Sequence, residues 1–147
     1  MPVPLSGYRY ASVYALLLDV GRLFTPARWP SGPPPGEPGK CYIEAASWAW
    51  GATDAPAYVE GMAWTGLFPI EHAWCSTRSG TVLDPTWEEP GSAYLGLPVK
   101  PTVAVDLMRR HGDALLTHGP VTREWMRDGV PPDILMDVGR PVPKVDA

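Results

Sequence analysis

Three side chains that together could attack a carbonyl group occur in order along the chain: Cys41, His72 and Asp84. A thiolate is a strong nucleophile, an imidazole can take up and return its proton, and a carboxylate can orient the imidazole. We expect a helix to begin at Lys40 or Cys41 and to end near Gly51. The N–H groups and positive dipole end of its first turn would then lower the pKa of the Cys41 thiol. The alternative is that Cys41 is a small buried hydrophobic residue.

His72 lies in a segment that we expect to form a strand, at residues 69–76. After a turn at 78–80, another strand is expected at 81–84, so that Asp84 ends it. Side chains alternate between the two faces of a strand, so Cys75 should point away from His72 and belong to the core.

The length of the hairpin loop decides whether Asp84 meets His72. A three-residue loop at 77–79 places the two side chains directly opposite each other, and a loop at 78–80 with a bulge makes them diagonal neighbours on one face. A two-residue turn at 79–80 separates them. In the first two arrangements the carboxylate accepts a hydrogen bond from one ring nitrogen, and the other nitrogen is free to take the thiol proton.

A family resemblance rests on these residues and their neighbours. Cys41 at a helix start is followed by Tyr-Val-Glu-Gly at 58–61, His-Ala-Trp at 72–74 and Asp-Pro-Thr-Trp at 84–87. This order resembles the transglutaminase-like core of the papain-like superfamily, and it covers about residues 39–97. The compact spacing resembles small bacterial or phage members of the superfamily.

The resemblance implies roles for the individual residues. Cys41 would be the nucleophile, His72 the general base and acid, and Asp84 the residue that orients His72. The chain contains no asparagine and no glutamine, so a Cys-His-Asn site or a glutamine oxyanion donor is excluded. One oxyanion donor would be the Cys41 backbone N–H, and Trp29 is the candidate for the other. Trp29 has an alternative interpretation as a loop aromatic residue that covers the core.

The remaining segments predict an α+β fold with a papain-like or transglutaminase-like core. In this fold, N-terminal helices pack on a small antiparallel sheet, and the C-terminal segment is helical. A proline-rich stretch at 29–39 must be a loop, either a lid or a plain surface segment. The expected elements besides those above are a helix at 8–24, a strand at 57–63, helices at 102–110, 120–127 and 132–138, and a frayed end at 141–147.

Length and composition favour one globular domain spanning residues 1–147, with its core at 39–97 and a helical extension at 98–147. The 45% hydrophobic content is that of a globular protein. A net charge of −4 without a basic stripe argues against nucleic acid as a partner. No long apolar run resembles a signal or a membrane span, and two cysteines make no disulfide framework. We therefore expect a cytoplasmic protein without a membrane partner.

A metal site is the weaker interpretation of the same residues. Zinc bound by Cys41, His72, Cys75 and Asp84 would require all four side chains to converge, which the strand alternation opposes. We expect no metal and no other cofactor.

Other polar residues have simpler interpretations. His111 and His118 are expected at the surface, and the adjacent pair Glu88 and Glu89 is expected to be solvated charge. Glu60 and Glu71 could lie near the cleft or be exposed.

Two classes of function remain open. The first is a cysteine-dependent hydrolase or acyltransferase, such as a peptidase, deamidase or transamidase, that acts on an amide or ester carbonyl through a thioester. Its substrate would be a peptide or protein. The second is a catalytically inactive transglutaminase-like scaffold that binds a protein or ligand.

Overall fold

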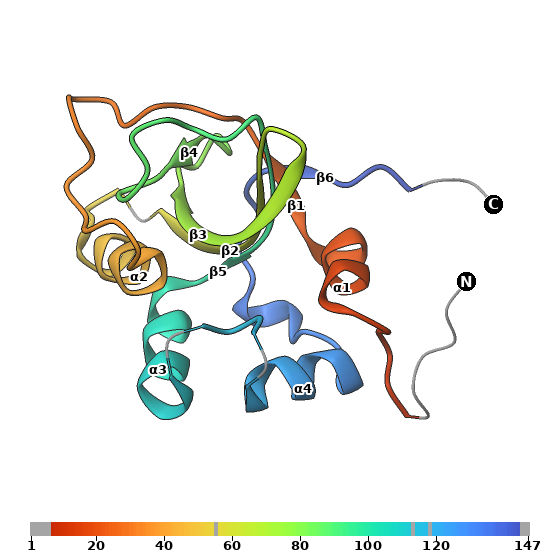
Figure 1. Cartoon of the computed structure of the whole chain (residues 1–147). Coiled ribbons are helices and arrows are strands. Elements are labelled where there is room, and N and C mark those ends of the chain that lie inside the picture. The colour runs from red at the N-terminus through yellow and green to blue at the C-terminus, as the bar shows by residue number, and fades with distance from the viewer. Residues whose placement is uncertain (1–6, 55, 113, 118, 145–147) are drawn as a thin grey trace.

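A computed structural model describes residues 7–54, 56–112, 114–117 and 119–144 of the chain. The helices and strands in these ranges follow one another along the chain as shown in Figure 1. They are α1 (Val13–Val20), β1 (Arg22–Phe24), α2 (Cys41–Gly51), β2 (Ala57–Thr65), β3 (Phe68–Ser76), β4 (Val82–Leu83), β5 (Ala93–Val99), α3 (Pro101–His111), α4 (Pro120–Asp128), a 3-10 helix (Pro132–Ile134) and β6 (Arg140–Pro141).

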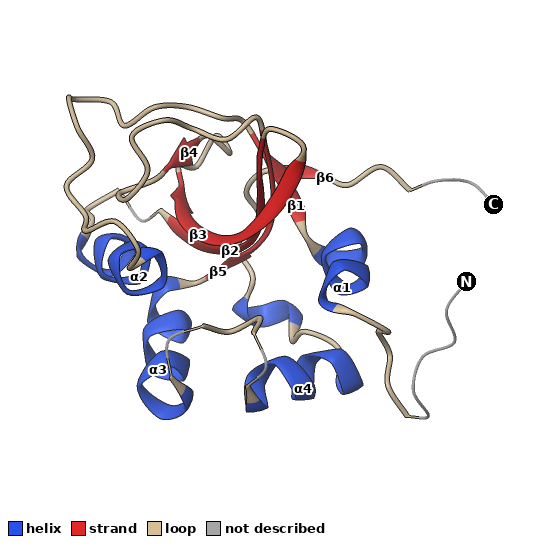
Figure 2. Cartoon of the chain, in the orientation of Figure 1, coloured by secondary structure: helices blue, strands red, loops and turns tan. Residues whose placement is uncertain are grey.

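The strands form one antiparallel sheet in the order β4-β3-β2-β5-β1-β6. The sheet curls so strongly that the chain after β1 meets the start of β4. Thr25 donates its backbone N–H to the Gly80 carbonyl at 2.9 Å and accepts a hydrogen bond from the Val82 N–H at 2.9 Å. The helices lie on the outer, convex side of this curved sheet (Figure 2).

The larger hydrophobic core fills the space between the helices and the convex face of the sheet. Alanines on one face of α2 allow this helix to pack closely against β3, and residues of α3 and α4 complete the core. Its fully buried members include Leu16, Leu17, Ala45, Tyr58, Ala73, Cys75, Leu97, Val99, Ala104 and Leu115.

A smaller core lies inside the curl, on the concave face. Trp74 is at its centre and is fully buried, with Phe24 and Tyr94 in edge-to-face contact at centroid distances of 5.9 and 5.0 Å. The strands β2, β3 and β5 therefore bury both of their faces in this region. This explains why β3 has an unbroken run of buried residues from His72 to Ser76.

Two glycines make the tight curl possible. Gly61 of β2 lies directly opposite Gly96 of β5. A Cβ atom at Gly61 would come within 2.2 Å of the Leu95 carbonyl oxygen, and one at Gly96 would come within 2.6 Å of the Val59 side chain and 2.9 Å of the Trp74 ring. Only residues without a side chain fit at this crossing.

Most of the expected elements agree with the structure. They are the helix at Cys41, the strands at 57–63 and 69–76, the turn at 78–80, and the helices at 102–110 and 120–127. The segment at 29–39 is a loop, as expected.

The expected helix at 8–24 is wrong in its extent. Ser12 caps α1 by accepting the Ala15 N–H at 3.0 Å, and the helix ends before Gly21. The next three residues, 22–24, instead pair with β5. Apolar side chains at helical spacing continued into a strand because both elements bury that side of the chain.

The expected boundary between a core at 39–97 and a helical extension does not match the packing. It divides β5, which we did not anticipate and which pairs with both β2 and β1. Pro98 within β5 disguised this strand in the sequence, although its carbonyl still accepts the Met136 N–H at 3.0 Å. The residues beyond 97 also supply buried side chains to the larger core, including Ala104 and Trp125.

The expected helix at 132–138 is also wrong. Only residues 132–134 form a 3-10 turn, after which the chain is extended and Leu135 bridges to Val99. Residues 140–141 form β6, and Lys144 contacts the Asp19 carboxylate at 3.1 Å, so the frayed end expected at 141–147 is wrong at these residues. Residues 145–147 lie outside the described ranges. In the ranges that the structure describes, no helix has the length and apolar character needed to cross a bilayer.

We predict that Gly96→Ala lowers the free energy of unfolding by about 1–3 kcal/mol, because the added methyl group overpacks the core around Trp74. Urea denaturation monitored by circular dichroism measures this change. Gly51→Ala at the end of α2 is the matched control, because a Cβ there meets nothing within 4 Å. Equal stability of the two variants would contradict the packing argument.

Candidate active site

The hairpin between β3 and β4 fixes the register of the candidate residues. Cys75 lies opposite Leu83, and continuing this register places Asp84 opposite Trp74. His72 is two residues from Trp74 on the same strand, so His72 and Asp84 are diagonal neighbours on the concave face. This is the arrangement expected for the loop at 78–80.

The loop itself shows how this register is enforced. Thr77 donates its N–H to the Thr81 carbonyl at 3.0 Å, and the Gly80 N–H bonds to the Thr77 carbonyl at 3.0 Å. Gly80 has a φ of 82°, a left-handed conformation that glycine adopts without strain.

His72 and Asp84 form a buried pair. The His72 Nε2 atom lies 2.6 Å from Asp84 Oδ2, and the side chains are only 2% and 3% exposed. The second carboxylate oxygen, Oδ1, accepts hydrogen bonds from the Thr86 N–H at 2.9 Å, the Thr86 hydroxyl at 3.0 Å and the Trp87 N–H at 3.2 Å. Together with His72, these donors fix both oxygens of the carboxylate in place.

Aromatic rings hold the imidazole in its plane. The Trp87 ring stacks on His72 with a centroid distance of 3.7 Å and an interplanar angle of 14°, and the Trp74 ring lies at 6.0 Å. With Asp84 ionised, the Nε2–H donates to the carboxylate. The lone pair of Nδ1 is then available to accept a proton.

Cys41 is the first residue of α2 and is partly buried. Its sulfur faces the backbone N–H of Ala73, next to His72 on β3, and the N–H of Tyr42. Burial nevertheless raises the pKa of the Cys41 thiol, and the nearby carboxylates of Asp84 and Glu60 raise it further. The expected lowering of this pKa by the helix N-terminus is therefore wrong, because desolvation outweighs the two N–H groups.

The contact between Cys41 and His72 differs from the expected one. Helix α2 packs on the convex face with Ala73 and Cys75, whereas His72 faces the concave side with Trp74. No hydrogen bond joins Cys41 to His72 among the described residues. Both residues lie next to Ala73, at the part of β3 beyond its pairing with β4.

Cys75 is a core residue, as expected. It is fully buried, and its thiol donates a hydrogen bond to the Ala45 carbonyl at 3.1 Å. Burial raises the pKa of the Cys75 thiol strongly.

Trp29 does not reach the sulfur of Cys41 by any hydrogen bond in the described part of the chain. Its ring packs edge-to-face on Trp48 at 4.7 Å, two turns of α2 beyond Cys41. Trp48 is itself 39% exposed, so this contact lies at the surface of α2 and not over the core. The role of Trp29 as an oxyanion donor stays a prediction. The same loop is attached near the His-Asp pair, because Gly36 donates its N–H to the Pro85 carbonyl at 2.6 Å.

Glu60 is the buried polar residue whose importance the sequence analysis missed. Its carboxylate accepts hydrogen bonds from the Tyr58 hydroxyl at 2.7 Å and from the backbone N–H groups of Leu115, at 2.9 Å to both oxygens, and Leu116, at 2.6 Å. Burial raises the pKa of Glu60 to about 7, although these hydrogen bonds oppose the shift. An acidic residue on the core-facing side of an apolar strand was the signal available in the sequence.

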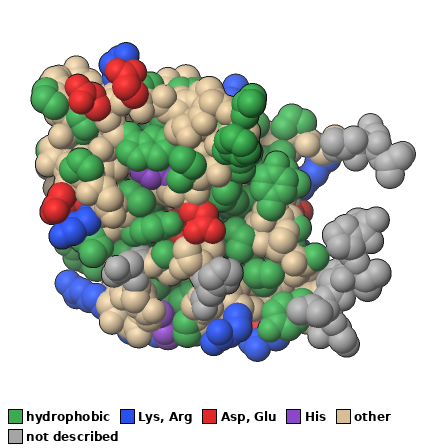
Figure 3. Space-filling model, in the orientation of Figure 1, with side chains coloured by type: hydrophobic (Ala, Val, Ile, Leu, Met, Phe, Trp, Pro, Cys, Tyr) green, Lys and Arg blue, Asp and Glu red, His purple; other side chains and the backbone are tan. Residues whose placement is uncertain are grey.

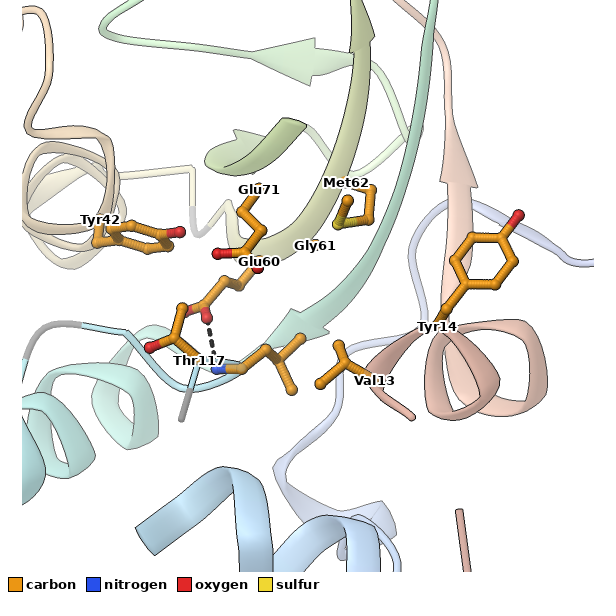
Figure 4. A pocket seen from close by; sticks show the side chains of 9 residues that line it. Val13, Tyr14, Tyr42, Glu60, Gly61, Met62, Glu71 and Thr117 are labelled. Atoms are coloured by element: carbon orange, nitrogen blue, oxygen red, sulfur yellow. Dashed lines mark hydrogen bonds between the residues drawn. The ribbon is translucent and has the colours of Figure 1, made fainter. Parts of the chain in front are cut away.

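A cavity of about 200 Å³ opens on the convex face beside Glu60. It is also lined by Glu71, Tyr42, Met62 and Val13, which come from β3, α2, β2 and α1 (Figure 4). In the space-filling view, acidic side chains lie at the centre of this face with hydrophobic side chains around them (Figure 3).

The remaining candidates lie apart from this region. His111 is exposed, as expected, and His118 falls outside the described residues. Glu88 and Glu89 are both exposed, as expected for solvated charge, and Glu89 also forms a bidentate surface ion pair with Arg28 at 2.9 and 2.8 Å. No group of three or more His, Cys, Asp or Glu side chains is placed to hold a metal ion within the described ranges.

No family model, curated protein or solved structure matches the chain. The resemblance to the transglutaminase-like core therefore rests on the sequence motifs alone.

We predict that iodoacetamide modifies Cys41 and spares Cys75 in the native protein, because only Cys41 is partly exposed. The rate should keep rising above about pH 8.5, the ordinary pKa of a thiol, since the pKa of Cys41 is raised. Mass spectrometry of tryptic peptides measures both rates. Preferential modification of Cys75 would contradict its burial in the core.

We further predict a stability signature of Glu60. Its pKa is raised from 4.5 to about 7 on folding, so the folded state holds this proton more tightly than the unfolded state. Its contribution to the free energy of unfolding is full below pH 4.5 and is lost as the pH rises to about 7, a change of about 3 kcal/mol. The stability difference between wild type and Glu60→Gln should shrink by that amount between these pH values.

Urea denaturation at a series of pH values measures the Glu60 effect. Glu124→Gln, at an exposed position on α4, is the control for the loss of one carboxylate. A Glu60→Gln difference that stays constant or grows with pH would contradict the raised pKa.

Proposed function

We propose that the chain is a cysteine-dependent hydrolase or acyltransferase that acts on an amide or ester carbonyl through a thioester. The observation that supports this proposal is the buried His72–Asp84 pair with a 2.6 Å hydrogen bond. A fully buried imidazole that is held by a carboxylate and stacked by an indole is typical of a positioned general base.

In the proposed reaction, Cys41 begins as a neutral thiol, consistent with its raised pKa. As the sulfur attacks the carbonyl carbon, its proton moves to Nδ1 of His72, and Asp84 stabilises the imidazolium. The imidazolium then gives this proton to the leaving amine or alcohol, and a thioester remains on Cys41. Water or an amine attacks the thioester, with His72 accepting the proton of the attacking group and returning it to the sulfur.

The N–H groups of Ala73 and Tyr42 support this role of Cys41, because they stabilise negative charge on the sulfur as its proton leaves. The proposal requires the Cys41 side chain to approach His72 when substrate binds. Contacts between nucleophile and base are often long in an empty site.

The family to which the chain would belong is also part of the proposal. The motifs at 58–61, 72–74 and 84–87 resemble the transglutaminase-like core of the papain-like superfamily, and the compact chain resembles small bacterial or phage members. We further propose that the substrate is a peptide or protein in the cytoplasm.

Two observations favour a second candidate, a scaffold of the same kind that binds a protein or ligand without catalysis. The pKa of Cys41 is raised, and no hydrogen bond connects Cys41 to His72 in the described part of the chain. A binding module would keep the His72–Asp84 pair as a structural link between β3 and the segment after β4.

We predict that p-nitrophenyl acetate acylates Cys41 and that Asp84→Asn slows this step by about a hundredfold or more. The asparagine Nδ2 would face the Nε2 atom as a donor, which favours the tautomer with the proton on Nδ1. This nitrogen could then no longer accept the thiol proton. Stopped-flow release of p-nitrophenol, with mass spectrometry of the acylated peptide, measures the rate and the site.

Asp54→Asn, at an exposed position, is the control for this loss of charge, and its acylation rate should equal that of wild type. Full acylation of the Asp84→Asn variant, or no acylation of Cys41 in wild type, would favour the binding module.

A further inference from the structure

The cavity beside Glu60 carries negative charge without a matching positive charge. None of the Lys and Arg side chains, all of which lie in the described ranges, forms a salt bridge with Glu60 or Glu71. Glu60 is 2% exposed, and a buried carboxylate normally has a cationic partner or loses its charge. Burial raises the pKa of Glu60 to about 7, and the neighbouring Glu71 carboxylate adds to this shift.

The two carboxylates differ in what they can offer a ligand. Both oxygens of Glu60 already accept hydrogen bonds from Tyr58, Leu115 and Leu116, so Glu60 contributes mainly its charge. Glu71 is exposed and forms no hydrogen bond with another described residue. Its oxygens are therefore free to accept hydrogen bonds from a ligand.

The other walls of the cavity suit an alkyl chain with a polar end. Tyr42 points from α2 toward the two carboxylates, and Met62 and Val13 lie on the opposite side (Figure 4). The volume of about 200 Å³ exceeds the roughly 150 Å³ of an engineered cavity that accepts benzene. A guanidinium or ammonium group on a short alkyl chain therefore fits, with its N–H groups toward Glu71.

We propose that this cavity binds the cationic side chain of a basic peptide, with Glu71 accepting its hydrogen bonds and Glu60 supplying the field. A guanidinium is the preferred group, because its five N–H donors in a planar fork match the oxygens of a carboxylate.

The position of the cavity relates this inference to the proposed function. Tyr42 directly follows Cys41, and the Glu60 carboxylate is close enough to raise the pKa of the Cys41 thiol, so the cavity lies next to Cys41 on the convex face. If the proposed function holds, the cavity selects substrates with a basic residue near the bond that Cys41 attacks. The binding itself does not depend on the chemistry of Cys41.

The test compares n-butylguanidinium with n-butylurea, a neutral molecule of nearly the same shape, in an NMR titration of the ¹⁵N-labelled chain. We expect the guanidinium to bind at least about tenfold more tightly, as for one charge-assisted hydrogen-bonded contact, and to shift the amide signals of Tyr42, Glu71 and Met62. Glu71→Gln should weaken guanidinium binding about tenfold. Glu124→Gln, which removes the same charge on α4, should leave it unchanged.

Glu60→Gln provides a second variant, used only where circular dichroism shows a native fold, because Glu60 also fixes the backbone at 115–116. Equal binding of the urea and the guanidinium would overturn the proposal, as would equal weakening by Glu71→Gln and Glu124→Gln. The acylation of Cys41 is a separate measurement, so failure of either test leaves the other interpretable.

Discussion

The tight curl of the sheet depends on two glycines that face each other on the paired strands β2 and β5. Gly61 and Gly96 lie opposite each other, and neither position has room for a Cβ atom. This close approach bends the strands around Trp74, which fills the concave side. His72 lies opposite Gly61 on the neighbouring strand, so the same bend turns the imidazole toward the interior of the curl. The position of the candidate base is thus a consequence of backbone packing some distance from Cys41.

Two carboxylates buried on opposite faces of the sheet have different environments. Asp84 on the concave side meets His72 and three donors, so its charge is compensated. Glu60 on the convex side meets a hydroxyl and backbone N–H groups but no cation, and its pKa is raised to about 7. Cys41 lies near both, and both raise the pKa of its thiol. Burial and both carboxylates therefore favour the neutral thiol over the thiolate at Cys41.

Sequence reasoning was most accurate where the pattern is local. The Cys41 helix and the β3–β4 hairpin follow from glycine, proline and strand alternation, and they bring His72 and Asp84 together. Sequence reasoning failed where contacts between residues far apart in the chain determine the structure. The strand β5 contains a proline and joins strands far apart in the sequence, and the face on which α2 packs depends on the whole curled sheet. The prediction of a lowered pKa for Cys41 was wrong for the same reason, because the desolvation that raises this pKa arises from tertiary contacts.

The stacking of Trp87 on His72 gives the site an optical property of its own. The Trp87 ring lies 3.7 Å from the His72 ring. A cationic imidazole in contact with an excited indole accepts an electron from it more readily than a neutral imidazole does, so it quenches the indole more strongly. Protonation of His72 should therefore dim the fluorescence of Trp87, whereas Trp50, exposed on α2, has no such neighbour among the described aromatic contacts. Trp87 is one of seven tryptophans in the chain, and its part of the emission would then respond to the charge of His72 without a substrate, a label or a known reaction.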